Sequence, residues 1–174
     1  MPIACYRYRT AFHDKPLPVT GSIQWVWKAF ADLTPKEVEA IFQLRQAVFV
    51  VEQNCPYLDV DGLDDQALHL MGWRDEGLVA TLRLFPAFEP YGGRVSIGRI
   101  CSRPDVRKSG TGRELMQQCI DLIDERYAEK ETQIGAQHYL NNFYASFGFS
   151  QCSEPYMEDG IEHILMLRAA AASR

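Results

Sequence analysis

Residues 96–116 read SIGRICSRPDVRKSGTGRELM, and this stretch decides the fold. An apolar, β-forming run is followed by a basic turn that contains Gly110 and Gly112, and then by apolar residues at helical spacing. This order predicts a strand, a turn and an amphipathic helix. The start of a helix offers unpaired backbone N–H groups and the positive end of the helix dipole. Because glycines let the backbone close on a phosphate, the turn predicts a pyrophosphate site.

Two glycines alone do not identify such a site. A Rossmann turn needs a third glycine where Leu115 stands, and a Walker loop needs a Gly-Lys-Ser/Thr sequence that this stretch lacks. A nucleotide-binding α/β protein is therefore disfavoured. The alternative is an ordinary strand-to-helix connection that binds no ligand. Features elsewhere in the chain are needed to choose between the two.

The chain carries a net charge of −5, but the charge is unevenly distributed. Five basic residues lie within 99–113 against a single acid, Asp105. A local cationic patch on an acidic protein favours a small anionic ligand. It disfavours nucleic acid, which would require a broad basic face.

A second charged cluster is acidic and lies within 52–65, a segment without Lys or Arg. Its members are Glu52, Asp59, Asp61, Asp64 and Asp65. Such a run is typical of a solvated acidic loop. The functional interpretation is a surface that attracts a cationic amine, and the sequence leaves both interpretations open.

The composition predicts one globular domain, because the chain has 174 residues, 47% of them hydrophobic, and mixed charges. No segment approaches the ~20 apolar residues of a membrane span, so we expect no membrane association. The five cysteines are odd in number and include no Cys-x-x-Cys pair, and the four histidines are scattered. We therefore expect reduced thiols, a cytoplasmic protein and no metal site.

The pattern along the chain predicts a weakly ordered N-terminal arm over 1–22, an α/β (α+β) domain over 23–168 and a frayed tail over 169–174. Residues 34–37 form a capping box, and the helix that follows is expected to continue to Phe49. Further helices are expected over 112–127 and 139–147. Strands are expected over 23–30, 67–74, 78–85, 94–101, 132–137, 149–153 and 163–167, with turns at 75–77 and 158–160.

The turn resembles motif A of the GNAT superfamily of N-acetyltransferases, which commonly reads Arg/Gln-x-x-Gly-x-Gly/Ala. Arg107, Gly110 and Gly112 occupy its three diagnostic positions. The resemblance implies the GNAT fold, a mixed and mostly antiparallel sheet flanked by helices. It also implies that the turn wraps the pyrophosphate of acetyl-CoA.

The same resemblance assigns cofactor contacts to the turn and to the strand before it. The implied residues are Ile100, Ser102, Arg107, Lys108, Gly110, Thr111, Gly112 and Arg113. Backbone groups of Ile100 and Ser102 would pair with the amides of the pantetheine arm. A local splay of the strand beside Ile100 and Cys101 would expose an N–H group for the thioester carbonyl.

Residues 137–149 resemble motif B of the superfamily, which ends in Tyr, three residues and Gly-Phe. Tyr144, Gly148 and Phe149 match this pattern. Gln137 stands where the motif usually has Asn, and its amide offers the same hydrogen bonds to the pantetheine arm. Two motifs in the correct order are more specific than either one alone.

Further segments resemble the ElaA family of small bacterial acyltransferases. They are 44–57, the Asp59-x-Asp61 that follows, 135–137 and 156–164. This resemblance covers most of the chain from Trp25 onward. It implies an acceptor groove beside 44–65, which connects the acidic cluster there to an amine acceptor.

Together these resemblances imply an enzyme that moves an acyl group from acetyl-CoA, or another acyl-CoA, to an amine by direct attack in a ternary complex. The amine must lose a proton, the oxyanion needs donors, and the leaving thiolate needs a proton. Tyr144 is the candidate acid. Glu52 is the candidate base because the apolar run 48–51 before it predicts partial desolvation, with His69 as the alternative. Cys101 is expected to be a small buried residue and not a covalent nucleophile.

A non-catalytic acyl-CoA-binding or sensing module would share the phosphate turn and would differ at Tyr144. The expected partner is a small-molecule or peptide amine. The sequence leaves open the identity of this amine, the length of the acyl chain and the oligomeric state, for which a homodimer is one option.

Overall fold

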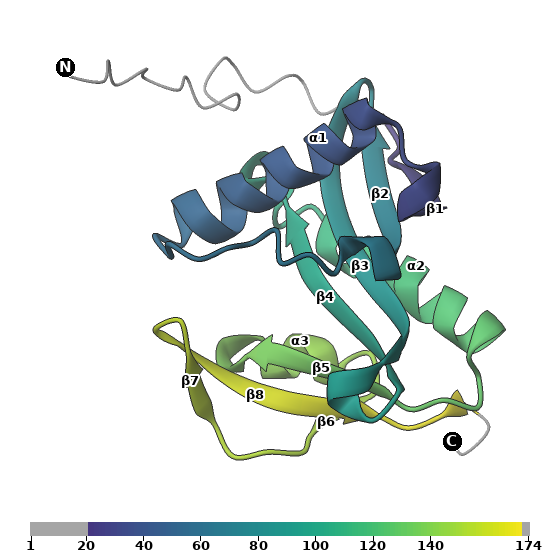
Figure 1. Cartoon of the computed structure of the whole chain (residues 1–174), viewed down its shortest axis with the longest axis vertical. Helices are drawn as coiled ribbons and strands as arrows, with labels where there is room; N and C mark the ends of the chain where they lie inside the picture. The colour runs from purple at the N-terminus through teal and green to yellow at the C-terminus, as the bar shows by residue number, and fades with distance from the viewer. Residues whose placement is uncertain (1–20, 172–174) are drawn as a thin grey trace.

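One mixed sheet of eight strands organises the described chain, in the order β1-β2-β3-β4-β5-β8-β6 with β7 paired to β8 (Figure 1). This computed structural model describes residues 21–171, so nearly all of the predicted N-terminal arm and the end of the predicted tail lie outside the described residues. The strands are β1 (Gln24–Ala29), β2 (Leu68–Arg74), β3 (Gly77–Phe88), β4 (Arg94–Ser102), β5 (Thr132–Gln137), β6 (Phe149–Gln151), β7 (Tyr156–Glu158) and β8 (Ile161–Arg168). The helices are α1 (Pro35–Arg45), α2 (Thr111–Arg126) and α3 (Asn141–Ala145).

The predicted order of strands and helices is confirmed, but the sequence did not reveal β7. This strand forms a hairpin with β8 across Asp159 and Gly160, whose φ angles of 49° and 80° are typical of a tight hairpin turn. The turn predicted at 158–160 therefore joins β7 to β8. The strand predicted over 149–153 ends at Gln151, and the helix predicted over 139–147 is shorter than expected.

The sheet parts between β4 and β5. These strands are parallel and pair at Val95 with Thr132 and at Ser96 with Gln133, and then they diverge. On either side of the parting the strands are antiparallel, with β1 to β4 on one side and β5, β8, β6 and β7 on the other (Figure 1). The divergence leaves one edge of β4 without a strand partner.

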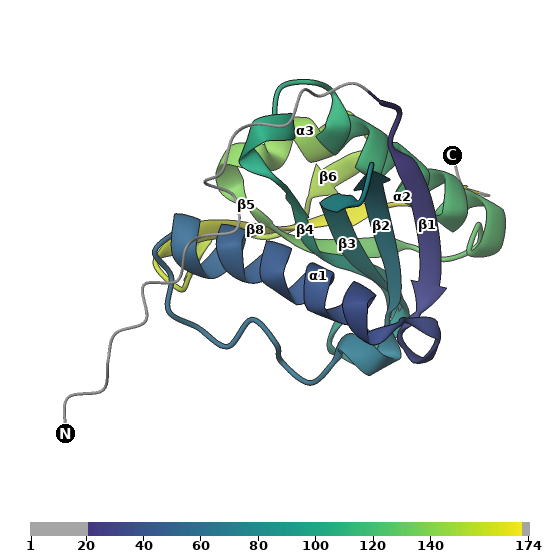
Figure 2. The same cartoon turned by 90° about the horizontal axis from the view of Figure 1, so that it is seen from above.

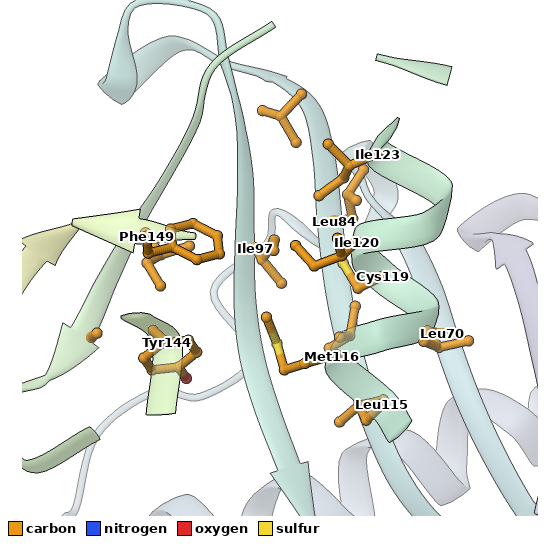
Figure 3. Close-up of a cluster of buried hydrophobic side chains, with 14 of the residues drawn as sticks. Leu70, Leu84, Ile97, Leu115, Met116, Cys119, Ile120, Ile123, Tyr144 and Phe149 are labelled. Atoms are coloured by element: carbon orange, nitrogen blue, oxygen red, sulfur yellow. The ribbon is translucent and has the colours of Figure 1, made fainter. Parts of the chain in front are cut away.

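The helices cover both faces of the sheet (Figure 2). α1 begins with the predicted capping box, in which Thr34 and Glu37 bond to each other's backbone N–H groups. It buries Ile41 and Leu44 against the sheet in one apolar cluster. On the other face, the apolar side of α2 packs against β2, β3 and β4 in a second cluster (Figure 3), which includes Leu115, Met116, Cys119, Ile120, Leu70, Leu84 and Ile97.

The helix predicted to reach Phe49 changes its geometry after Arg45. Residues Gln46–Glu52 form a π-helical segment, with the N–H of Gln53 donating to the Val48 carbonyl at 3.3 Å and that of Cys55 to Val50 at 3.1 Å. The β-branched valines of this segment are poor α-helix formers, which contributes to the change. Such wide turns occur mostly as short insertions and frequently at functional sites.

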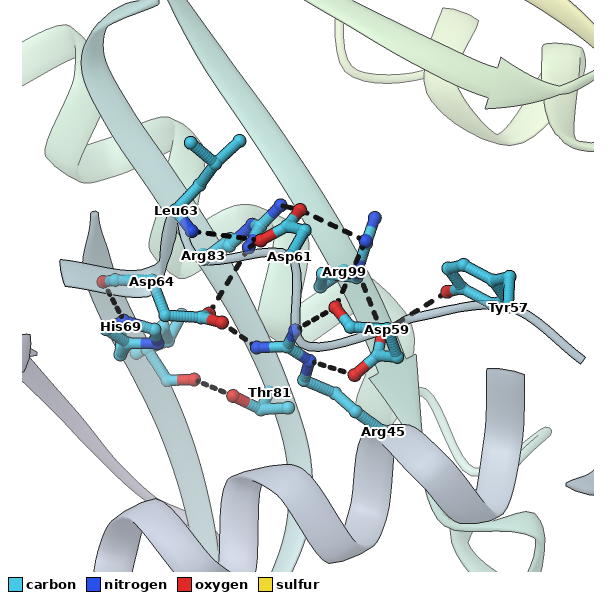
Figure 4. Close-up of polar contacts among 11 residues, drawn as sticks. Arg45, Tyr57, Asp59, Asp61, Leu63, Asp64, His69, Thr81, Arg83 and Arg99 are labelled. Carbon is cyan, nitrogen blue, oxygen red and sulfur yellow. Dashed lines mark hydrogen bonds and ion pairs between the residues drawn. The ribbon is translucent and has the colours of Figure 1, made fainter. Parts of the chain in front are cut away.

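The segment after the π-helical turn is held by a buried ion network, defined by Arg45, Arg83, Arg99, Asp59, Asp61 and Asp64 (Figure 4). Arg45 Nε donates to Asp59 Oδ2 at 2.9 Å, and its Nη1 donates to Asp64. Arg83 on β3 binds Asp61 with both terminal nitrogens, and Arg99 on β4 pairs with Asp59 at 2.8 Å. The network therefore ties one loop to α1, β3 and β4.

This network corrects both interpretations of the acidic cluster. Asp59 and Asp64 are 3% and 4% exposed and are paired with arginines, so they are neither a solvated loop nor a free surface for a cationic amine. Burial alone would raise the pKa of Asp61, but the hydrogen bonds and charge of Arg83 outweigh it and lower the pKa to about 2. Asp59 and Asp64 are therefore not available to an acceptor, whereas Asp61 lines a cavity with its carboxylate bound to Arg83, and its link to an acceptor stays a prediction.

Two other observations concern the described residues as a whole. None of the helices within residues 21–171 has the length and apolar character needed to cross a membrane. Cys55, Cys101 and Cys119 are buried free thiols, and Cys152 is an exposed one.

We predict that Arg45→Ala destabilises the protein by about 3–5 kcal/mol, because it leaves Asp59 and Asp64 buried without their partner. Urea unfolding of the purified variant measures this loss. Lys28→Ala is the matched control, since it removes a partly exposed pair with Glu37 and should cost less than about 1 kcal/mol. Equal losses in the two variants would contradict the assigned role of the network.

A second prediction concerns acid. Because the pKa of Asp61 falls from 3.8 to about 2 on folding, its stabilising effect is complete above pH 3.8 and is lost as the pH falls to about 2. The difference in unfolding free energy between the wild type and Asp61→Asn should shrink over this interval. A difference that stays constant with pH would show that the Arg83 pair does not stabilise the ionised carboxylate.

Candidate active site

A cavity of about 640 Å³ opens where β4 and β5 part. Its wall is built by the π-helical segment, β4, the glycine turn, β5, α3 and the β7–β8 hairpin. Segments far apart in the sequence therefore meet at one opening. A site of this size accommodates a small-molecule ligand.

The exposed edge of β4 carries a β-bulge beside the cavity. Thr81 pairs with Cys101 and Arg83 with Gly98, so Arg99 and Ile100 face a single residue of β3. Arg99 has a φ of 52°, an uncommon conformation for a non-glycine residue. Bulges bend a strand and re-aim its groups, often next to active sites. The splay expected beside Ile100 and Cys101 is thus present.

The glycine turn presents a row of free backbone donors. Lys108 and Gly110 have φ angles of 63° and 95°, and α2 begins at Thr111. Outside helices and strands, no backbone hydrogen bond within residues 21–171 is donated by the N–H groups of 108–110. Thr111 and Gly112 are the first two residues of α2, where N–H groups have no partner within the helix. A Cβ on Gly110 or Gly112 would meet no atom within 4 Å, so the space beside the turn is open. This geometry suits a phosphate ligand.

The structure brings part of the predicted cofactor set to the cavity. Its wall includes Ile100, Ser102, Arg107, Gly112 and Gln137. Lys108, Gly110, Thr111 and Arg113 belong to the adjoining turn and to the first turn of α2.

Two members of that set contribute less than their side chains suggested. The Thr111 side chain is buried and bonds to the Ser109 hydroxyl at 3.0 Å, so Thr111 offers only its backbone N–H. The Arg113 guanidinium lies over the rings of Phe143 and Phe147.

The cationic patch predicted over 99–113 is not one surface. Arg99 belongs to the buried ion network, whereas Arg103 binds Asp105 with two nitrogens. These basic residues are close in the sequence, but they belong to a strand and to the turn after it, and their side chains meet different partners.

Arg107 makes a bidentate ion pair with Glu52, at 2.6 and 2.8 Å. The hydrogen bonds that Arg107 donates to the Glu52 carboxylate raise the pKa of the guanidinium. The Glu52 side chain is 41% exposed, so the expected desolvation is wrong. Its role as a base stays a prediction, without the physical reason that suggested it. The pair joins a residue predicted to bind the cofactor to one predicted for catalysis.

Tyr144 lies on α3, where it belongs to the buried cluster of Figure 3 and also lines the cavity. It is buried, and burial raises the pKa of its phenol. The hydroxyl therefore keeps its proton at neutral pH, as a proton donor must.

The surroundings of Cys101 and His69 disfavour a catalytic role for either residue. Cys101 lines the cavity but is buried, and burial raises the pKa of its thiol to about 12, which disfavours the nucleophilic thiolate. His69 lies on β2 outside the cavity wall, with Nε2 at 2.9 Å from the Asp64 carbonyl. Its burial lowers the pKa of the imidazole. The alternative base is therefore in the wrong place.

A further group of residues lines the cavity and was not predicted from the sequence. Glu158 and His163, on the β7–β8 hairpin, and Tyr91, after β3, line the wall. Alternation along β8 could have revealed the face of His163, because Ile164 and Met166 point into the core. No local pattern could have placed Tyr91 beside the hairpin.

Comparison with known proteins identifies the family. The Acetyltransferase (GNAT) domain matches residues 65–169. Protein ElaA of Escherichia coli is 40% identical over 151 residues, which are 84% of this chain and 96% of ElaA. The crystal structure of Escherichia coli ElaA superposes with a TM-score of 0.79, at 39% identity, over 84% of this chain and 99% of that one. An acyl-CoA N-acyltransferase from Pseudomonas aeruginosa gives a TM-score of 0.81 at 43% identity, over 85% of this chain and 100% of that one. The chain therefore belongs to the GNAT acetyltransferase family, with ElaA among its close relatives.

Proposed function

We propose that this protein transfers an acyl group from acetyl-CoA, or another acyl-CoA, to an amine by direct attack in a ternary complex. Membership of the GNAT family supports acyl transfer from acyl-CoA. The observation that carries the finer proposal is the free edge of β4, which leads from the donors of the glycine turn into the cavity.

The proposed donor site follows that edge. The pyrophosphate lies on the N–H groups of 108–112, with Arg107 as the charged partner. The pantetheine arm pairs with the backbone of Ile100 and Ser102 as a strand would, and the Gln137 amide supplies a further hydrogen bond. The open space beside Gly110 and Gly112 and the lack of a strand partner on this edge support the arrangement.

The proposed chemistry uses the bulge and Tyr144. A backbone N–H freed at the bulge stabilises the oxyanion as the amine attacks the thioester carbonyl. The carbon–sulfur bond then breaks, and Tyr144 gives its proton to the thiolate. The buried thiol of Cys101 supports direct transfer over an acyl-cysteine intermediate.

Acetyl-CoA should stabilise the protein, because a ligand that binds only the folded state shifts unfolding by linkage. At about 100 times its Kd, we expect a rise in Tm of roughly 5–10 °C. NAD at the same concentration should give no rise. Arg107→Ala should reduce the shift, whereas Arg126→Ala, exposed at the far end of α2, should not. No shift at millimolar acetyl-CoA would overturn the donor site.

Tyr144→Phe should lower kcat about 100-fold or more, because it removes the proton donor. Binding of acetyl-CoA, measured by thermal shift, should be unchanged. Tyr127→Phe, a partly buried tyrosine outside the cavity wall, is the matched control. Full turnover of Tyr144→Phe, followed as release of CoA thiol, would exclude the acid role.

A further inference from the structure

The segment 156–164 resembles the ElaA family, but the proposed donor site uses none of it. It forms the β7–β8 hairpin, in which Tyr156 pairs with His163 and Glu158 with Ile161. Directly opposed residues of an antiparallel pair share a face. Glu158 and His163 both line the cavity, so this face of the hairpin is turned toward the site.

The imidazole of His163 is oriented by the backbone. Its Nδ1 lies 2.9 Å from the Ile161 carbonyl oxygen, which can only accept, so Nδ1 carries the proton in the neutral ring. Nε2 is then the nitrogen with the lone pair, and it has no hydrogen-bond partner among the described residues. The ring is half-buried beside Tyr156, with ring centroids 6.0 Å apart. A fixed tautomer with a free Nε2 is the form that a general base requires.

The wall beside this hairpin indicates the chemistry of the acceptor. Phe85, Phe88 and Tyr91 form a chain of ring contacts, with centroids 4.8 and 5.2 Å apart, and all three line the cavity. Glu158 lines the same cavity. Aromatic faces and a carboxylate together attract an organic ammonium group on an apolar body.

The hydroxyls of Tyr91 and Tyr156 lie close to each other above β5. A Cβ on Gly135 of β5 would lie 3.3 Å from the hydroxyls of both Tyr91 and Tyr156. The two hydroxyls therefore converge over Gly135, which itself lines the cavity. Any side chain at this position would press on both phenols.

Several charged and titratable groups of the described residues lie near His163 or line the same cavity. On its own hairpin they are Tyr156, Glu158, Asp159 and Glu162, of which Glu162 bonds to His138. Tyr91 meets Tyr156 over Gly135. Glu52, Asp61, Arg83, Arg99 and Arg107 line the same cavity and are paired with one another. Asp61 and Arg99 are paired within the buried ion network. Asp159 lies in the turn, whereas Glu158 is paired within the hairpin on the face that carries His163, so we assign the cation contact to Glu158.

We propose that this wall is the acceptor subsite for a primary amine on an aromatic or apolar body, with Glu158 binding the ammonium group and His163 Nε2 accepting its proton. This inference rests on the proposed function. His163 passes the proton to solvent, and the neutral amine nitrogen forms its bond to the thioester carbon as the carbon–sulfur bond breaks. The thiolate takes a proton from Tyr144, and the surplus proton on the new amide nitrogen restores Tyr144.

The test measures CoA release from acetyl-CoA with 2-phenylethylamine as the probe, across a range of pH. His163→Gln should lower kcat/KM about 100-fold near neutral pH. The loss should shrink as the pH approaches the amine's own pKa, where free amine needs no base. His138→Gln is the matched control, because His138 bonds to Glu162 and does not line the cavity. Glu52→Gln is compared in the same assay and should lack this pH-dependent loss.

Wild-type rates in His163→Gln at every pH would overturn the base, and so would a pH-dependent loss in Glu52→Gln alone. A second measurement tests the subsite without turnover. In the protein with CoA bound, the imidazole Cε1–H resonance of His163 should shift when 2-phenylethylamine is added. An unmoved resonance would overturn the acceptor subsite. Stabilisation by acetyl-CoA, which does not involve this wall, separates that failure from a failure of the proposed donor site.

Discussion

The divergence of β4 and β5 after two paired positions is the constraint on which the molecule depends. A continuous sheet would satisfy the backbone groups of β4 and would leave no cavity. Because the strands part, one edge keeps free N–H and C=O groups, which a buried backbone tolerates only if a ligand or water satisfies them. The bulge at Arg99 and Ile100 bends β4 where this edge is exposed. The fold thus keeps one edge of β4 free of a strand partner beside the cavity.

The buried ion network holds the loop after the π-helical segment against α1, β3 and β4, next to the free edge of β4. Arg99 takes a left-handed backbone conformation and also pairs with Asp59, so the bulge and the network act on one residue. Buried ion pairs are costly to desolvate, and their net contribution to stability is often small. Their directional bonds nevertheless fix the loop after the π-helical segment relative to β3 and β4. The part of the cavity wall that this loop forms therefore depends on directional ion pairs and hydrogen bonds as much as on apolar packing.

The sequence predicted the features that depend on neighbouring residues. The capping box at Thr34, the glycine turn and the order of strands and helices each follow from local patterns. The partners of the acidic cluster could not be predicted in this way. Asp59 meets Arg45 and Arg99, which are 14 and 40 positions away, and such pairs exist only after the chain has folded. His163 and Tyr91 could not be placed at one cavity for the same reason. They are far apart in the sequence, and the pairing of β8 with β5 brings the hairpin to the cavity.

The Arg107–Glu52 ion pair joins the glycine turn to the π-helical segment. An exposed pair of this kind is weak, so a diphosphate at the turn would displace the carboxylate at little cost. Arg107 would then exchange one anionic partner for another, and Glu52 would be left at the cavity mouth with an uncompensated negative charge. The loaded protein would attract cations more strongly than the empty one. Under the proposed function, this exchange of partners at Arg107 would favour binding of the donor before a cationic acceptor.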